Sequence, residues 1–512
     1  MHRPEPGRVP TRSHRLLVRL GVSLVAVGLV ALGARPVPSQ ADSWPTDPND
    51  PRTPPTVAID RLPTVQINGV AWHQIVHQPT NTVYVAGRFT TARPAGAAPN
   101  TQTSTRNNLL AYDLTTGALR TGFTASLNAQ ALGVAMSPDG SRLYVVGDFT
   151  SVNGVSRSRI AALNPTTGAL VGSFDARANG SVRSVVASST TVWVGGNFTS
   201  VNSVSRGQLA ALRSIDGGVL PWAGRADNGR VNALALSPSA DRLVVGGAFT
   251  TLNGSDRPGY GLGALDATTG LLVVPFQAND VVRNAGPQSA ILSLGWDDTH
   301  FFGTGYIYGT GGNLEGAFSA KWSDHRIRWV EDCHGDSYGV YPSPTAVYVA
   351  GHPHYCLNLG GFPEMPKGTA QRAVAFSPQA TGVLTKDTRG YPSFTGQPAP
   401  TLLNFFPQLD QGSVTGQSQA AWAVDGAGDY VVFGGEFRNV NGVGQQGLVR
   451  FATRNIASNL QGPKATGTDF TPTVSTPGAG LVRVSWIANF DYDNSDLTYT
   501  VLRERCPVPS PR

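Results

Sequence analysis

The feature that most constrains this chain is a Gly-x-Phe motif that returns at roughly regular intervals. The gaps between successive anchor phenylalanines are 60, 49, 51 and 188 residues. The last gap has room for three further steps, and two weaker copies fill it, Phe301–Tyr308 and Val347–Tyr355. We therefore predict seven copies of one structural unit. The anchor residues are Phe89, Phe149, Phe198, Phe249 and Phe437.

Each copy has the pattern of four short strands. In one copy, the apolar segment Asn228–Leu236 is followed by a turn and by Arg242–Phe249, a strand with glycines where backbones approach closely. Gly263–Phe276 then has the pattern of a strand, a tight hairpin turn and a second strand. Four short antiparallel strands per repeat are typical of propeller blades, whereas solenoids with repeats of this length are mostly helical or parallel. We predict an all-β fold, a seven-bladed β-propeller.

The innermost strands show a column of small residues, as convergence on an axis requires. The copies align on Ile75, Val134, Val185, Leu234, Leu294, Val340 and Val424. The residues just before these are Gln74, Gly133, Ser184, Ala233, Ser293, Gly339 and Ala423, of which six are small. The residues two positions before are candidates to line the entrance of an axial channel or to fill space between blades: His73, Leu132, Arg183, Asn232, Leu292, Tyr338 and Trp422. We expect His73 and Trp72 to be fillers between blades.

The N-terminus explains the positive charge of the chain. Residues 1–41 contain six Arg and one Glu, and the apolar segment Leu20–Ala34 precedes a small-x-small site at Ser39 and Ala41. This pattern predicts a signal peptide over 1–41, with an uncleaved anchor as the alternative. Fifteen apolar residues fall short of a membrane span. Removal of residues 1–41 leaves 33 basic and 32 acidic side chains, so we predict no nucleic-acid partner for the remaining chain. With the signal peptide removed, we predict a secreted protein without a membrane span.

The segments "VGGNFTSVN", "VGGAFTTLNG" and "FGGEFRNVNG" resemble the Gly-Gly-x-Phe-Thr-x-Val-Asn-Gly repeats of secreted bacterial β-propeller proteins that carry fibronectin type III domains. The resemblance implies a Pro-rich linker over 42–63, a propeller over 64–458, a second linker over 459–469 and a fibronectin type III-like segment over 470–512. Trp486 and Tyr499 would be core aromatics of that segment. A complete β-sandwich of this kind needs about 100 residues, so we expect the segment to be truncated, with docking of the segment on the propeller or on a partner as the alternative.

One window, Glu331–Cys356, gathers most of the reactive side chains, and three interpretations of it remain open. A disulfide between Cys333 and Cys356 suits an oxidising compartment, and the resemblance implies a Cys-bearing blade there. A metal site would use His334, His352 and His354 with Asp332 or Asp336, although the spacing matches no standard zinc motif. Catalysis of glycoside hydrolysis would use a pair among Glu331, Asp332 and Asp336.

Further candidates are aromatic. The Pro- and Gly-rich insertion 357–418 carries Tyr391 and Phe394, which either form a rim for a sugar or peptide or pack the loop onto the blades. Tyr338, Trp422 and His73 are the candidates at the channel mouth.

The chain contains no P-loop, dinucleotide fingerprint, G-x-S-x-G or H-E-x-x-H motif. We therefore predict a monomeric, non-catalytic binding or scaffold protein for an extracellular glycan or protein, with no cofactor beyond a structural metal ion. The alternatives are a carbohydrate-active protein, as hydrolase or glycan-binding accessory, and a metal-dependent extracellular enzyme.

Overall fold

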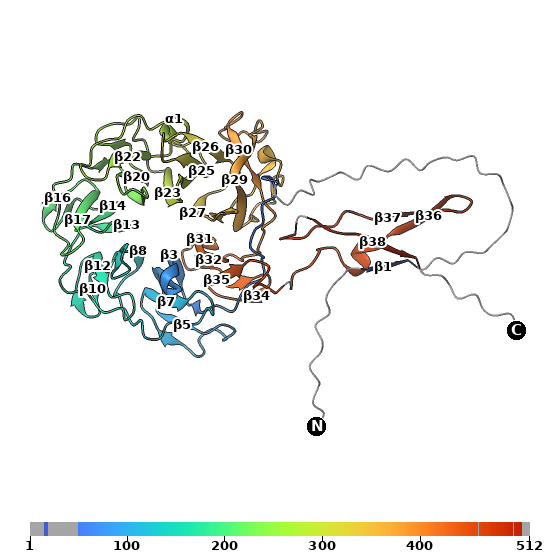
Figure 1. Ribbon diagram of the computed structural model, residues 1–512, viewed down its shortest axis with the longest axis horizontal. Coiled ribbons are helices and arrows are strands. Elements are labelled where there is room, and N and C mark those ends of the chain that lie inside the picture. The colour runs from blue at the N-terminus through green and yellow to red at the C-terminus, as the bar shows by residue number, and fades with distance from the viewer. Residues whose placement is uncertain (1–14, 19–49, 459, 495, 504–512) are drawn as a thin grey trace, which may run out of the picture. The chain divides into compact units, whose positions relative to one another are not determined.

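The computed structural model describes residues 15–18, 50–458, 460–494 and 496–503. The chain divides into two compact units, one formed by Pro51–Asn459 and one by the two ends of the chain. In the larger unit, seven antiparallel sheets are arranged radially around an axis (Figure 1). Their innermost strands are β3 (Val70–His77), β8 (Ala131–Met136), β13 (Ser181–Ala187), β19 (Val231–Leu236), β23 (Ser289–Trp296), β27 (Ser337–Pro342) and β31 (Ala421–Ala427).

The strands of each sheet follow one another outward in chain order. The second strands, rich in Val and Gly, are β4 (Thr82–Arg88), β9 (Leu143–Gly147), β14 (Thr191–Asn197), β20 (Arg242–Gly247), β24 (His300–Ile307), β28 (Val347–Gly351) and β32 (Tyr430–Gly435). The third strands are β7 (Leu109–Asp113), β12 (Ile160–Leu163), β17 (Leu209–Arg213), β22 (Leu262–Asp266), β25 (Gly316–Lys321), β29 (Ala373–Val383) and β35 (Leu448–Ala452). The fifth and sixth sheets add the fourth strands β26 (Ile327–Glu331) and β30 (Pro398–Leu402).

Short elements lie in the loops of this unit, most of them between strands of one sheet and some between consecutive sheets. The short strands are β2 (Gln66–Ile67), β5 (Thr91–Arg93), β6 (Ser104–Thr105), β10 (Ser151–Val152), β11 (Val155–Ser156), β15 (Ser200–Val201), β16 (Val204–Ser205), β18 (Ala226–Asp227), β21 (Thr251–Leu252), β33 (Asn439–Val440) and β34 (Val443–Gly444). The helical turns of this unit are η1 (Gln78–Thr80), α1 (Ala278–Val281) and η2 (Leu357–Leu359). Within the described residues, no helix is long and apolar enough to cross a membrane.

The ring of sheets is closed. Each innermost strand contacts the innermost strand of the next sheet, and β31 of the last sheet contacts β3 of the first. The interior between sheets is apolar, with core clusters built from Val, Leu, Ala and the anchor phenylalanines; Phe149 and Phe249 are completely buried. Burial of these side chains supplies the main stabilisation of the ring. An open, spiralling stack is therefore excluded.

The repeated motif is architectural. Asn128 accepts hydrogen bonds from the backbone N–H groups of Thr150 and Ser151, and Asn68 and Asn179 do the same one sheet before and one sheet after. Asn153, Asn202 and Asn253 have a left-handed backbone, at φ 51° for Asn153, and each donates to the carbonyl of the Gly in the outer turn of its sheet. These side chains fix the loops of the sheets that carry the motif.

The N-terminal segment completes the last sheet. In the first four sheets the chain after the third strand turns back and forms a single outer bridge, at Leu119, Leu170, Val219 and Leu272. In the seventh sheet that place is taken by residues 58–62, since Leu62 bridges to Arg450 and Ala58 donates to the carbonyl of Ala452. Figure 1 shows this blue segment beside β35. Residues 57–59 are buried, so the predicted linker over 42–63 is wrong for this part.

The smaller unit contains the helical turn η3 (Gly467–Phe470) and the hairpin of β36 (Thr473–Gly478) and β37 (Leu481–Ser485). Its last strand, β38 (Thr500–Arg503), pairs in parallel with β1 (Arg15–Val18). Trp486 and Tyr499 lie with their ring centroids 5.8 Å apart. The predicted cleavage site at Ser39 to Ala41 lies outside the described residues.

Candidate functional site

The same irregularity occurs in the innermost strand of every sheet. The pairing with the second strand skips one residue, between Ala71 and His73 in the first sheet, and at the matching place in the other six. Such a β-bulge leaves one residue out of the ladder and redirects its side chain. We call the seven skipped residues the bulge ring: Trp72, Leu132, Arg183, Asn232, Leu292, Tyr338 and Trp422.

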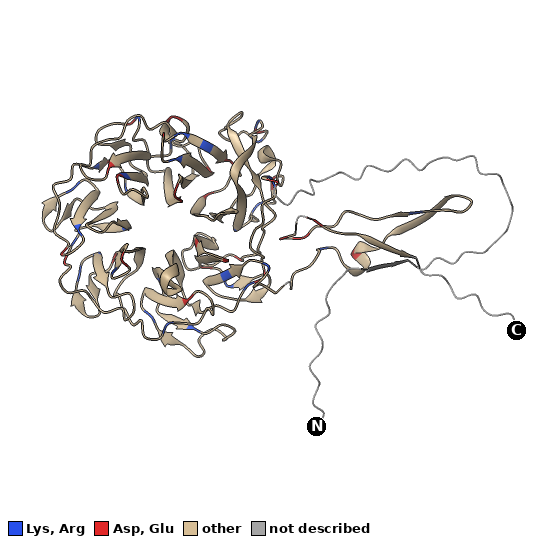
Figure 2. Cartoon of the chain, viewed as in Figure 1, with Lys and Arg blue, Asp and Glu red and all other residues tan. Residues whose placement is uncertain are grey.

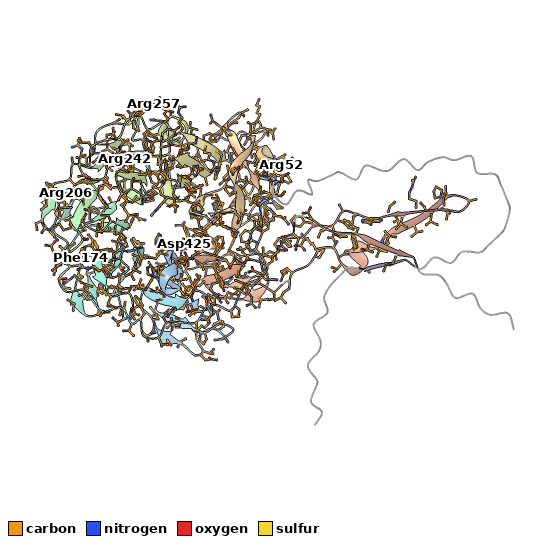
Figure 3. All side chains as sticks on the ribbon, in the orientation of Figure 1. Arg52, Phe174, Arg206, Arg242, Arg257 and Asp425 are labelled. Atoms are coloured by element: carbon orange, nitrogen blue, oxygen red, sulfur yellow. A yellow bond between two sulfur atoms is a disulfide. The ribbon has the colours of Figure 1, made fainter. Side chains whose placement is uncertain are left out.

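All seven residues of the bulge ring line a cavity on the axis of the sheets. The cavity measures about 1140 Å³ and is bordered by every innermost strand. This volume slightly exceeds the usual range of about 300–1000 Å³ for small-molecule sites. Figure 3 labels Asp425, another lining residue, near the axis. The cavity can therefore hold a ligand larger than a single sugar or amino acid.

The residue type differs from sheet to sheet at the bulge position, whereas the residues directly before and after it are similar in nearly all sheets. The residue before each bulge is fully or almost fully buried, and the residue after it is small in six of the seven sheets. Gly133 shows why, because a Cβ there would lie 2.9 Å from the carbonyl oxygen of Arg183 on the next innermost strand. The architecture therefore dictates the flanking residues and leaves the bulge residues free to differ. The wall of the cavity is therefore not sevenfold symmetric in its chemistry.

In the first sheet the predicted alignment of the innermost strand is wrong by one residue. His73 pairs with Ala86, as Gly133 pairs with Val146, so His73 rather than Gln74 belongs to the column of small residues. The Nδ1 atom of His73 accepts a hydrogen bond from the backbone of Val134 at 3.4 Å. His73 thus contacts the neighbouring sheet and also lines the cavity. Trp72, which we expected to be a second filler, is the bulge residue of the first sheet.

Three members of the bulge ring form an aromatic arc on consecutive sheets. The rings of Trp72 and Trp422 meet edge to face with centroids 5.1 Å apart, and those of Trp422 and Tyr338 lie 4.3 Å apart. The indole N–H of Trp72 donates to Gln130 at 2.9 Å, and that of Trp422 donates to Glu436 at 3.0 Å. Because these hydrogen bonds fix the rings, the arc offers a rigid apolar surface.

Hydrogen bonds with His352 and Asp336 position the hydroxyl group of Tyr338. The backbone N–H of Asp336 donates to Nε2 of His352, so Nδ1 of this imidazole carries the proton and donates to the Tyr338 oxygen at 2.9 Å. The Tyr338 hydroxyl then donates to Oδ2 of Asp336 at 3.3 Å. Burial lowers the pKa of His352 to about 4 and raises that of Asp336 to about 6. Burial also raises the pKa of Tyr338, which therefore stays a neutral donor.

The disulfide predicted in the window Glu331–Cys356 is present. Cys333 and Cys356 are bonded and buried, and they join the start of the sixth sheet to the loop after its second strand. Glu331 and Asp332 lie beside this bond, each 1% exposed. Burial raises the pKa of both carboxyl groups to about 8. Neither residue lines the cavity, and a catalytic role for them stays a prediction. Asp336 does line it.

The three candidate metal ligands do not converge. His334 Nε2 lies 2.6 Å from Asp387, His352 contacts Tyr338, and His354 Nδ1 lies 2.9 Å from Glu364. Among the residues that the structure describes, no group of three or more His, Cys, Asp or Glu side chains could hold a metal ion. The predicted metal site is therefore wrong for these histidines, each of which serves a different hydrogen-bond network.

The aromatics of the insertion also lie away from the axis. Tyr391 stacks on His334 with centroids 4.1 Å apart, and Phe394, 7% exposed, belongs to an apolar core cluster with Leu384 and Ala399. Neither lines the cavity, so the predicted rim is not formed by this pair. Sequence reasoning missed Asp387 and Glu364, because an isolated acid in a long loop carries no signal of the histidine it contacts.

A closed ring of antiparallel sheets around an axial cavity is a β-propeller, and the fold predicted from the repeat is confirmed at this level. Residues 138–170 match a family described as a domain of unknown function (DUF5122), a beta-propeller. No curated protein matches the chain in sequence.

The chain is similar to several solved structures. It is similar to the Cps50 (Swd1) β-propeller domain of Myceliophteria thermophila, with 9% identity, a TM-score of 0.41 and coverage of 77% of this chain and 99% of that one. It is also similar to U3-55K, with 12% identity, a TM-score of 0.45 and coverage of 78% and 99%. The RRP9 WD40 repeats give 12% identity, a TM-score of 0.43 and coverage of 77% and 99%.

Proposed function

We propose that this chain is a secreted, seven-bladed β-propeller that binds an extracellular glycan at the bulge ring and does not transform it. The observation that carries the proposal is the aromatic arc of Trp72, Trp422 and Tyr338 at the wall of the axial cavity. One face of a pyranose ring presents C–H groups, which pack on an aromatic face, while its hydroxyl groups need polar partners.

Polar partners lie on the same cavity wall. Asn232, Gln417 and Asp336 line the cavity and can exchange hydrogen bonds with sugar hydroxyl groups. The charged residues of the chain are scattered around the ring (Figure 2). Among the residues that are described, these charges form no basic stripe in this view, and the absence of a nucleic-acid partner stays a prediction.

The carboxylates of the cavity favour binding over hydrolysis. Among the described residues, the acids that line it are Asp336, which precedes β27, and Asp425, which lies in the second half of β31. Asp425 is turned to the backbone, since it accepts the N–H of Val76 at 2.7 Å. Hydrolysis of a glycosidic bond by two carboxyl groups requires both to flank the same bond. The bulge ring does not present such a facing pair.

The proposal is tested by a glycan array followed by calorimetry and a reducing-sugar assay on every glycan that binds. We expect micromolar to millimolar binding of at least one glycan and no release of reducing ends. If no glycan on the array binds and a protein ligand is captured specifically, the glycan proposal is contradicted and the ligand is a protein.

One observation supports a glycosyl hydrolase as a second candidate. Burial raises the pKa of Glu315 to about 7, and its neighbour Asp336, with a pKa of about 6, adds to this effect. Two neighbouring carboxyl groups with raised pKa values are typical of an acid–base pair. Release of reducing ends that is abolished in Asp336→Asn and retained in Asp298→Asn, an exposed control, would establish hydrolysis.

A further inference from the structure

Beside the aromatic arc, the cavity wall has a second arc that is polar and positively charged. Arg183 is the bulge residue of the third sheet and Asn232 that of the fourth. Arg230 directly precedes β19 in the fourth sheet and also lines the cavity. Because β13 and β19 are neighbours, the two arginines belong to adjacent sheets. Leu132 and Leu292 separate this basic arc from the aromatic arc on either side.

The two guanidinium groups lack a counter-ion within the described residues. No carboxylate oxygen lies within 4.0 Å of either one, whereas several other arginines of the ring have such a partner, among them Arg120, Arg213 and Arg257. The Nε atom of Arg183 is buried and without a hydrogen-bond partner. Arg230 makes one side-chain hydrogen bond, from Nε to Oδ1 of Asn232 at 3.0 Å. Most of the donors of this pair are therefore available to a ligand.

The groups around the pair leave it electropositive. Burial, and then the charge of Arg230, lower the pKa of Arg183, while Asp148 and Tyr306 act in the opposite direction. Asp148 is engaged elsewhere, since its Oδ2 atom accepts from Gln130 at 2.7 Å. Tyr306 also lines the cavity and offers a hydroxyl group. Two neighbouring cations in a partly desolvated cavity repel each other, and a bound anion would relieve this cost.

From this arrangement we infer that the ligand is an acidic glycan, whose carboxylate, phosphate or sulfate group is held by Arg183 and Arg230. Guanidinium groups bind such oxyanions through paired N–H donors. A sugar ring on the aromatic arc, with its acidic substituent directed across the cavity, uses both arcs at once. This inference rests on the proposed glycan-binding function and specifies the substrate class of the same site.

The test compares matched glycans on the full chain. The array pairs neutral glycans with counterparts that carry uronic acid, sialic acid, phosphate or sulfate, so that the source of the anion is resolved. For the best acidic binder and its neutral partner, calorimetry is run on wild type, Arg183→Gln, Arg230→Gln and the control Arg257→Gln. Arg257 lies on the rim, paired with Asp280 at 2.8 Å (Figure 3).

We expect wild type to bind the acidic glycan at least about tenfold more tightly than its neutral partner, with a preference that weakens as salt is raised. Arg183→Gln and Arg230→Gln should each remove most of this preference, because they weaken binding of the acidic glycan more than binding of its neutral partner, whereas Arg257→Gln should behave as wild type. Equal binding of both glycans, or an unchanged preference in the two arginine variants, would overturn the inference and leave glycan binding intact. Absence of any glycan binding would overturn both.

Discussion

Trp72 of the first sheet and Trp422 of the last sheet meet edge to face, with ring centroids 5.1 Å apart. They come from opposite ends of the propeller sequence, so the aromatic arc exists only when the ring of sheets is closed. Closure depends in turn on the N-terminal segment that completes the last sheet. Ligand binding and the stability of this closure are therefore linked, and whatever loosens the junction should weaken binding.

Arg450 holds that junction and should be the most sensitive residue in it. The side chain is 1% exposed and donates to the carbonyl oxygens of Pro63, Leu114 and Thr115 on two other segments. Arg450→Met leaves these acceptors buried and without donors, at a cost of about 3 kcal/mol in the free energy of unfolding. Urea denaturation measures the loss. Arg438→Met, which alters an exposed side chain in the same sheet, should change stability by less than about 0.5 kcal/mol. Equal effects of the two variants would contradict the role of Arg450.

The tight approach of neighbouring innermost strands can be tested at Gly133. A Cβ at this position meets the backbone of Arg183 at 2.9 Å, whereas one at Gly172 meets nothing within 4 Å. Gly133→Ala should therefore lower the free energy of unfolding by about 1–3 kcal/mol. Gly172→Ala should be neutral within about 0.5 kcal/mol. A neutral Gly133→Ala would show that the strands near the axis are less closely packed than the structure has them.

The disulfide between Cys333 and Cys356 closes a loop with a sequence separation of 23 residues. By restricting the unfolded chain, a bond of this span stabilises the fold by about 3 kcal/mol. The double variant Cys333→Ser, Cys356→Ser should show this loss in thermal or urea unfolding. Addition of a reductant should destabilise the wild type and leave the double variant unchanged. A reductant effect of equal size in both proteins would assign the loss to another cause.

The buried acids predict that stability falls between about pH 6.5 and pH 8.5. Burial raises the pKa of Glu331 from 4.5, and that of Asp332 from 3.8, to about 8. A carboxyl group with a raised pKa in the folded state stabilises the fold fully below its unfolded pKa, and this contribution is lost as pH rises through the folded pKa. Below about pH 6.5 buried histidines oppose the trend, because burial lowers the pKa of His334 and His352 to about 4.

The measurement is the melting temperature across this range. The wild type should melt at a higher temperature near pH 6.5 than near pH 8.5, and Glu331→Gln should reduce the slope. Asp298→Asn, at an exposed acid, should keep it. A melting temperature that rises with pH over this interval would be inconsistent with the buried, protonated acids described above.

The sequence was informative about architecture because the architecture repeats. Each copy of the Gly-x-Phe motif faces the same packing problem, so glycines, phenylalanines and turn asparagines recur at fixed places. The last sheet shows the limit of this reasoning. Residues 58–62 have no repeat signal, yet they replace the outer hairpin, and Asn441 donates to the carbonyl of Ile59 as Asn153 donates to that of Gly168.

The candidate site was predicted in part. The column containing Arg183, Asn232, Tyr338 and Trp422 was recognised as a possible channel entrance, but the first sheet was misaligned by one residue, so His73 stood where Trp72 belongs. A β-bulge inserts one residue without any residue-type signature, and only the strand pairing reveals it. The acids and histidines of the window Glu331–Cys356 were more conspicuous in the sequence. Most of them are buried in networks that support the disulfide-bearing loop.

The most direct test of the account is the change in glycan affinity when a tryptophan is removed from either end of the axial cavity. Trp422 belongs to the bulge ring, and Trp296, 41% exposed, lines the cavity at the opposite end of an innermost strand. By calorimetry with the best array binder, Trp422→Ala should weaken binding at least about tenfold, and Trp296→Ala should leave it within about twofold of wild type. Unchanged affinity in Trp422→Ala, with a loss in Trp296→Ala, would place the ligand at the other mouth and contradict recognition by the bulge ring.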